Sequence, residues 1–336
     1  MHEVQVRLLT KKVGWSVVTI LVVITFNFFL FRVLPGDPAK AGVRDPRLSP
    51  AAVEAARIRF GLDKPVFLNT EGDSLFDSQY FKYLGALAEG DLGTSYAFNN
   101  RPVTSLIGQA LRNTVWLILP AQFLSIVAGV GLGLWAAWRR GTKIDVAALT
   151  FSLFMWALPT FFLGILLLFF GSRYLGFPSA GRVTIGAQYS SVWDQIWDLV
   201  THLFLPTLTF TLVLLGEYML VMRSSVVEVF GEDYIQTAKA KGLTTLDIIR
   251  KHAFRNAMLP IVTLIALNLG FTVSGAIQVE TVFSWPGLGK LTVDAVSQRD
   301  YPVLQGAFLL LAIAVIVTNL AAELLYLRLD PRVTDV

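Results

Sequence analysis

The chain has 336 residues, of which 54% are apolar and only 15% are charged. Soluble domains carry about 25% charged residues, so this composition argues against a soluble multidomain protein, a disordered chain and a nucleic-acid-binding protein. With no cysteine, disulfides and thiolate metal sites are excluded. Its three histidines, His2, His202 and His252, are far apart and show no metal-ligand spacing. The composition indicates a polytopic membrane protein, and orientation in the membrane explains the net charge of +4 better than an anionic partner does.

About 20 apolar residues cross a hydrocarbon core of roughly 30 Å, and six runs are long enough. They are Val13–Leu34, Thr114–Trp138, Val146–Phe170, Leu203–Met222, Ala257–Val279 and Val303–Ala322. The first run follows Lys11 and Lys12 but exceeds the length of a signal-peptide core, and no A-x-A site follows it. We therefore expect a retained anchor.

Lysine and arginine in short loops set the orientation of membrane helices. Basic residues are frequent in the N-terminal tail, the 2–3 loop, the 4–5 loop and the C-terminal tail: Arg7, Lys11, Lys12, Arg139, Arg140, Lys143, Arg223, Lys239, Lys241, Arg250, Lys251, Arg255, Arg328 and Arg332. The 3–4 and 5–6 loops hold few. This pattern predicts an all-α protein with six transmembrane helices and both termini in the cytoplasm.

The chain then divides into five parts. We expect a tail at 1–12, a first span at 13–34, an extracytoplasmic loop at 35–113, a five-helix core at 114–330 that includes a cytoplasmic loop at 223–256, and a tail at 331–336. In the outer loop, Ser49-Pro50 resembles a helix start and Gly61 a helix stop. A second short helix is expected at Gln79–Ala88, and the polar stretch Leu68–Ser78 is expected to form a surface loop.

The cytoplasmic loop 223–256 is predicted to be helical with a break at Gly242, where the lack of a Cβ permits a sharp bend. Thr244 and Asp247 have the spacing of a capping box. Apolar residues alternate with lysine and arginine in this loop, which indicates an amphipathic segment. Such a segment could rest on lipid, pack in the core or dock into a partner.

A few residues within the spans are polar or helix-breaking. Glu217 is ionisable inside a span, which is a functional-site hypothesis by default: it could line a translocation path or pair with a neighbouring helix. Asn268 has the same two interpretations. Pro159 lies near a span centre, where a kink could shape a gate or be a static bend. Gly129 and Gly133 permit close helix packing. The carboxylates Glu280 and Glu323 lie at span ends and are expected at the interface.

The loop segment Asp233–Pro260, DYIQTAKAKGLTTLDIIRKHAFRNAMLP, resembles the EAA loop of permease subunits in ATP-binding-cassette importers of the peptide/nickel branch. Only Ala238 and Gly242 match the general motif at their expected places. Other stretches resemble the B-type permease of dipeptide and oligopeptide importers, in family order: RVLPGDP (32–38), GLDKP (61–65), DLGTS (91–95), ALPTFFLG (157–164), ETVFSWPGLG (280–289), RDYPVLQG (299–306) and DPR (330–332). The stretch Leu68–Ser78 extends beyond the usual pattern.

The resemblance implies a type I ABC importer permease in a bacterial or archaeal cytoplasmic membrane. Its partners would be a homologous second permease, two cytoplasmic ATPases that use ATP and Mg²⁺, an extracytoplasmic substrate-binding protein and membrane lipid, without nucleic acid. The coupling residues would be Tyr234, Thr237, Ala238, Lys239, Lys241, Gly242, Leu243 and Leu246. Ala238 would permit close approach. The chain has no P-loop, because Ser284 and Leu291 break the pattern around Gly289-Lys290. No catalytic residue, metal or bound cofactor is expected.

Peptide is the expected cargo, with nickel complexes, glutathione and oligosaccharides as alternatives within the same machine. A secondary transporter is the second hypothesis, although six spans without an inverted repeat are few for that class. An intramembrane enzyme is the third, and the chain contains neither H-E-x-x-H nor G-x-S-x-G.

Overall fold

The computed structural model describes residues 2–33, 63–70 and 74–329. Within these ranges the regular structure is helical, apart from an isolated β-bridge between Thr94 and Pro102. The helices are α1 (His2–Val33), α4 (Gln79–Ala88), α5 (Val103–Trp138), α6 (Lys143–Ala157), α7 (Thr160–Leu175), α8 (Val192–Val229), α9 (Asp233–Ala240), α10 (Thr245–Ile248), the π-helical turn η1 (Ile249–Ala253), α11 (Phe254–Val282), α12 (Leu288–Gln298) and α13 (Tyr301–Leu329). The helix expected after Ser49 and the tail 331–336 lie outside the described residues.

Several described helices are long and apolar enough to cross a membrane. They are α1 within Thr10–Arg32, α5, α8 and α13 within Tyr301–Ala321, so the chain is a polytopic helical membrane protein. α4 occupies the range predicted for it, and α5 ends at Trp138 as predicted. However, α5 begins eleven residues before the predicted start at Thr114, and α1 already begins at His2, so most of the expected tail 1–12 is helical.

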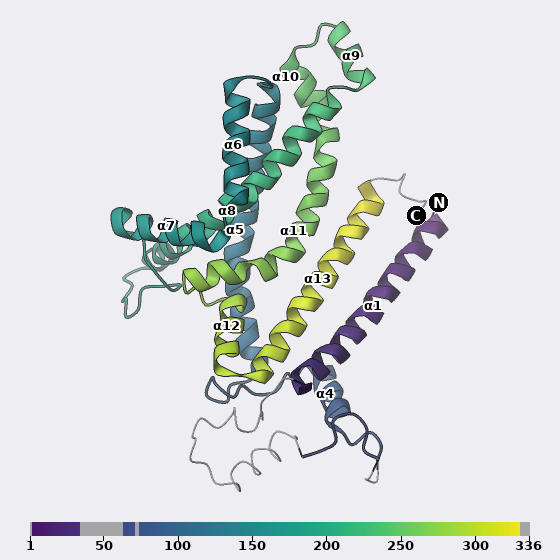
Figure 1. Ribbon diagram of the computed structural model, residues 1–336, viewed down its shortest axis with the longest axis vertical. Coiled ribbons are helices and arrows are strands. Elements are labelled where there is room, and N and C mark those ends of the chain that lie inside the picture. Colours follow the sequence, from purple (N-terminus) through teal and green to yellow (C-terminus); the bar gives the residue numbers. More distant parts are fainter. Residues whose placement is uncertain (1, 34–62, 71–73, 330–336) are drawn as a thin grey trace.

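The predicted span Val146–Phe170 is not one straight helix, because the chain turns sharply inside it. α6 ends at Ala157, α7 begins at Thr160, and the two helices make an angle of 102°. Pro159 has no N–H to donate, its ring conflicts with a preceding carbonyl, and it keeps Leu158 in an extended conformation with ψ 132°. The expected kink is therefore a full break, and α7 runs across the bundle axis in Figure 1.

The centre of the bundle is the packing of α5 on α8. A Cβ at Gly129 would lie 2.6 Å from the Cβ of Tyr218, and one at Gly133 would lie 2.8 Å from the carbonyl oxygen of Met219. The two glycines therefore let the backbones approach as the spacing predicts. α11 packs beside α8 and α13, and α1 packs mainly on α13.

Basic loops gather at one end of the bundle. The α5–α6 turn and α9–α10 both lie at the upper end in Figure 1, and α1 begins and α13 ends toward that end, whereas α4 and α12 lie at the lower end. Near this end, Arg223 of α8 pairs with the first turn of α6: its Nε and Nη2 donate to the Asp145 carboxylate at 2.6 and 2.8 Å. Such a bidentate pair fixes α8 against α6 in a defined orientation.

Candidate functional site

The loop between α8 and α11 projects from the upper end of the bundle as two short helices, α9 and α10 (Figure 1). α10 continues without a loop through η1 into α11, whereas residues 230–232 separate α9 from α8. A force applied to α10 therefore reaches α11 directly through one helical path.

The projecting loop has a small apolar core of its own. Ile235, Ala238 and Ile248 are buried together, with Phe230 and Leu243 packed against them. The small side chain of Ala238 permits close approach of α9 to α10 and faces the interior of the loop.

Gly242 makes the turn between α9 and α10. Its φ is +79°, it is exposed, and a Cβ there would meet no atom within 4 Å. Its N–H donates to the Lys239 carbonyl at 2.9 Å, and the Leu243 N–H donates to the Ala238 carbonyl at 3.3 Å. Both bonds satisfy carbonyls at the end of α9, which is the usual function of a left-handed glycine after a helix. The predicted break is confirmed, and its cause is backbone conformation.

Thr244 caps α10 as the spacing predicts, but its hydroxyl bonds the Asp247 carboxylate, whereas in a capping box that carboxylate accepts from the backbone N–H of the capping residue. The Asp247 N–H donates to the Thr244 hydroxyl at 3.2 Å, and that hydroxyl donates to the Asp247 carboxylate at 2.6 Å. The second bond lowers the pKa of the Asp247 carboxyl. The cap therefore remains charged at neutral pH and stabilises the start of α10.

The outer surface of the loop carries the remaining expected coupling residues. Thr237, Lys239 and Lys241 are exposed, as are the larger Tyr234 and Leu246 at 41% and 46% of their surface. The Tyr234 hydroxyl accepts a hydrogen bond from Asn256 of α11 at 2.6 Å, which fixes its ring. Exposed apolar groups between lysines are the composition of a helix that docks into a groove.

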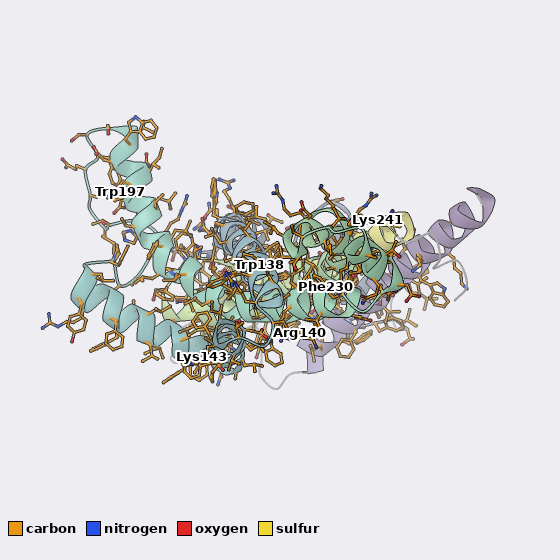
Figure 2. All side chains as sticks on the ribbon, turned by 90° about the horizontal axis from the view of Figure 1, so that it is seen from above. Trp138, Arg140, Lys143, Trp197, Phe230 and Lys241 are labelled. Atoms are coloured by element: carbon orange, nitrogen blue, oxygen red, sulfur yellow. The ribbon has the colours of Figure 1, made fainter. Side chains whose placement is uncertain are left out.

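A pocket of about 380 Å³ opens beside this surface. Its lining is drawn from the end of α5, the end of α8, α9 and α10: Ala137, Arg140, Val227, Phe230, Gly231, Lys239 and Thr245. The Lys239 ammonium lies 5.6 Å from the centre of the Phe230 ring, a cation–π arrangement. Figure 2 looks onto this end and shows Phe230 between Arg140 and Lys241. The cations make this end suited to an acidic partner surface.

Within the bundle, the structure joins two of the three residues expected on a translocation path. The Asn268 amide of α11 donates to Glu217 Oε2 of α8 at 3.0 Å and to the Tyr218 hydroxyl at 3.3 Å. Gln122 of α5 also donates to that hydroxyl. Pro159 takes no part in these contacts and forms the α6–α7 break. Sequence reasoning missed Gln122 and Tyr218, although a glutamine inside an otherwise apolar span was an available signal.

At the lower end, the segment 280–289 is tied to α5. Glu280 lies two residues before the end of α11 and is fully buried within the protein. Its carboxylate accepts from the Thr114 hydroxyl at 2.6 Å and from the Lys290 N–H at 3.0 Å. A Cβ at Gly287 would collide with this carboxylate. The side chain of Glu323 lies outside the described side chains.

A second carboxylate ties two further motifs together. Asp300 is fully buried at the start of α13 and accepts from the Ser95 hydroxyl and from the N–H groups of Tyr96 and Ala97, at 2.5, 3.2 and 3.0 Å. The motifs at 91–95 and 299–306, which lie about 200 residues apart in the chain, thus form one structural unit beneath α5.

Comparison with known proteins identifies the family. Residues 129–335 match the family model of the binding-protein-dependent transport system inner membrane component, and residues 5–118 match the model of the N-terminal part of such membrane components. The chain belongs to this family. Its members are membrane permease subunits of ABC importers, in which separate ATPase subunits hydrolyse ATP and the EAA loop carries the coupling helix.

Relatives of this permease extend over nearly its whole length. It is 35% identical to the oligopeptide transport system permease protein AppB of Bacillus subtilis, over 95% of this chain and 96% of that one. It is 34% identical to the dipeptide transport system permease protein DppB of Escherichia coli K12, over 97% and 98%. It is also 34% identical to the glutathione transport system permease protein GsiC of Salmonella paratyphi A, over 96% and 97%.

Among solved structures, the permease is similar to a chain of the MetNI methionine ABC transporter in an inward-facing conformation. The TM-score is 0.56 at 16% identity, over 67% of this chain and 97% of that chain. This similarity shows the type I importer permease fold.

Proposed function

We propose that this permease forms half of the membrane pathway of an importer that carries di- and oligopeptides into the cytoplasm. The observation that carries the proposal is the match, over at least 95% of each chain, to permeases named for oligopeptide and dipeptide transport. A second homologous permease would complete the pathway, and a substrate-binding protein would deliver peptides to the extracytoplasmic side. Glutathione is the second candidate cargo, since a permease named for it is equally similar.

The coupling surface in this proposal is the exposed side of α9 and α10. Tyr234, Leu246 and the methylenes of Lys239 would enter a groove of the ATPase, and Lys241 would face an acidic rim. Gly242, Leu243, Thr237 and the buried Ala238 would keep the two short helices in the shape that fits. Because α10 continues into α11, movement of the ATPase would tilt α11, and with it the contact of Asn268 with Glu217.

We further propose six spans, with α6 and α7 counted as one bent span, and both termini in the cytoplasm of a bacterial or archaeal cell. The gathering of the α5–α6 turn and the α8–α11 loop at one end supports this orientation (Figure 1), and so does their basic charge. The segment 35–113 would then face outward, the core 114–330 would form the pathway, and 331–336 would be a cytoplasmic tail.

The polar group of Glu217 and Asn268 is proposed to line the path. Its support is the partial exposure of both side chains, which meet between α8 and α11, and the cost of an ionisable group in a span. A static pairing of α8 with α11 is the alternative.

The test is uptake by cells with and without this chain. Labelled peptides of two to six residues are offered in parallel with nickel and glutathione. We expect a loss confined to peptides, with a length dependence that separates dipeptide from oligopeptide import. A loss of glutathione or nickel uptake alone would overturn the cargo and leave the importer architecture in place.

A further inference from the structure

An apolar surface lies at the lower end of the fold, beside the end of α1. The side chains of Val66, Phe67, Leu68, Leu75 and Phe76 are exposed, although the polar letters of Leu68–Ser78 predict an ordinary surface loop. We name this set the apolar rim. Its aromatic rings pack on α4: the ring of Phe76 meets Phe81 edge-on at 4.8 Å, and that of Phe67 lies 5.4 Å from Tyr80.

The apolar rim begins at the depth of the membrane. The Tyr80 hydroxyl of α4 lies 2.8 Å from the Thr25 hydroxyl of α1, and the rings of Phe67 and Phe29 are 5.6 Å apart. The apolar span of α1 ends at Arg32. Since a helix rises 1.5 Å per residue, Thr25 lies about 10 Å inside that end. The start of α4 therefore flanks the last two turns of a membrane-spanning helix.

The rim also continues the side of α1 that faces away from the bundle. Val22, Phe26 and Leu30 are exposed at intervals of four residues and form one stripe along α1, and Thr25 and Phe29 border it. Aromatic rings beside such a stripe, at the end of a span, have the position of the aromatic residues that anchor proteins at the membrane interface. The occupant that this continuity favours is lipid.

A cationic pocket lies next to the rim. It has a volume of about 360 Å³ and is lined by α1, α4, the segment 91–96 and the start of α13. Arg32 enters it over the ring of Phe28, at 5.2 Å, and Lys82 lines it as well. Among the described residues, no carboxylate forms an ion pair with Arg32, and its Nε is buried without an acceptor. Asp91, the acidic residue among the described residues of the lining, accepts from the Gly93 N–H. A half-buried guanidinium favours an anion in this pocket.

We propose that residues 65–70 and 74–83 are an interfacial membrane anchor, whose apolar rim enters one leaflet and whose pocket holds the phosphate of an anionic phospholipid against Arg32. The assignment to the extracytoplasmic leaflet rests on the proposed orientation of the permease, whereas the contact with lipid does not.

The first experiment measures the surroundings of the rim by electron paramagnetic resonance. The chain has no cysteine, so single spin labels can be placed at Leu75→Cys and Phe76→Cys, in the assembled importer reconstituted in lipid with its other subunits made cysteine-free. Phe26→Cys serves as the lipid-facing reference and Glu89→Cys as the aqueous reference, since both side chains are exposed.

We expect the ratio of oxygen to nickel-chelate accessibility at residues 75 and 76 to be several-fold above that at residue 89 and close to that at residue 26. An aqueous ratio would overturn the anchor. Low accessibility to both reagents would overturn it too, because it would show that a protein partner covers the rim. Neither outcome depends on the cargo, so the anchor and the peptide proposal fail separately.

The second experiment tests the pocket by native mass spectrometry of the importer after exchange into micelles with phosphatidylglycerol, phosphatidylcholine or inorganic phosphate. Arg32→Gln should lower retention of phosphatidylglycerol several-fold, whereas Arg101→Gln, which removes an exposed arginine bonded to Gln109, should not. Equal retention in both variants would overturn the headgroup site, and retention of inorganic phosphate without lipid would assign the pocket to a free anion.

Discussion

Replacing Gly242 tests whether the α9–α10 turn sets the shape that couples ATP hydrolysis to transport. Because φ is +79° and a Cβ at this position would have no atom within 4 Å, the cost of Gly242→Ala is backbone strain alone, about 1–2 kcal/mol. Since 1.4 kcal/mol is about tenfold in an equilibrium constant, the native turn should become roughly 5- to 30-fold less favoured. Gly242→Asn should cost less, because asparagine tolerates this region. Gly242→Trp adds a bulky ring at the proposed interface.

The assay is peptide transported per ATP hydrolysed in the reconstituted importer, together with co-purification of the ATPase. We expect asparagine to remain near wild type, alanine to lower the ratio, and tryptophan to abolish coupling or ATPase binding while the spans still insert. If asparagine is as harmful as alanine, or if tryptophan transports normally, the assignment of this turn to coupling is wrong.

Three further predictions concern the bundle. Gly129→Ala should destabilise the detergent-solubilised permease by about 1–3 kcal/mol through overpacking against α8, which would lower the unfolding temperature. The control Gly131→Ala, whose Cβ would meet no atom within 4 Å, should leave stability unchanged or raise it. Equal losses of stability in the two variants would refute the close-packing argument. Asp300→Ala leaves several buried donors without an acceptor and should cost at least about 2 kcal/mol in the same measurement; an unchanged melting temperature would contradict this. Glu217→Gln keeps an acceptor for Asn268 but removes the charge, so it should raise the KM for peptide uptake with ATPase assembly intact, and an unchanged KM would favour the static pairing.

The sequence predicted best those features whose cause is local. Gly242 and the Thr244–Asp247 cap are encoded in a few adjacent residues, and the structure has both. The end of α5 at Trp138 is marked by the arginines that follow. These features depend only on neighbouring residues and not on tertiary contacts.

The direction that the chain takes after Pro159, and the contacts between residues distant in sequence, could not be predicted in this way. Residues 146–170 are apolar on both sides of Pro159, so hydropathy cannot distinguish a kinked span from a break of 102°. Ala238 is buried against Ile248, which lies beyond the turn at Gly242. Glu280 is buried against Thr114, which is 166 positions away in the sequence. The hydrogen bond from Asn268 to Glu217 joins residues 51 positions apart, and a single sequence contains no signal for such a pair.

The π-helical turn at Ile249–Ala253 has a geometric consequence for α11. Each residue advances an α-helix by about 100°, so a wider turn between α10 and α11 offsets the angular phase of everything that follows it. That phase decides which side of α11 meets α8, and in the present structure it presents Asn268 to Glu217. The single turn η1 thus sets how α10 is oriented relative to the contact of Asn268 with Glu217. Removing one residue from η1 would rotate the Asn268 amide away from the Glu217 carboxylate without changing either residue.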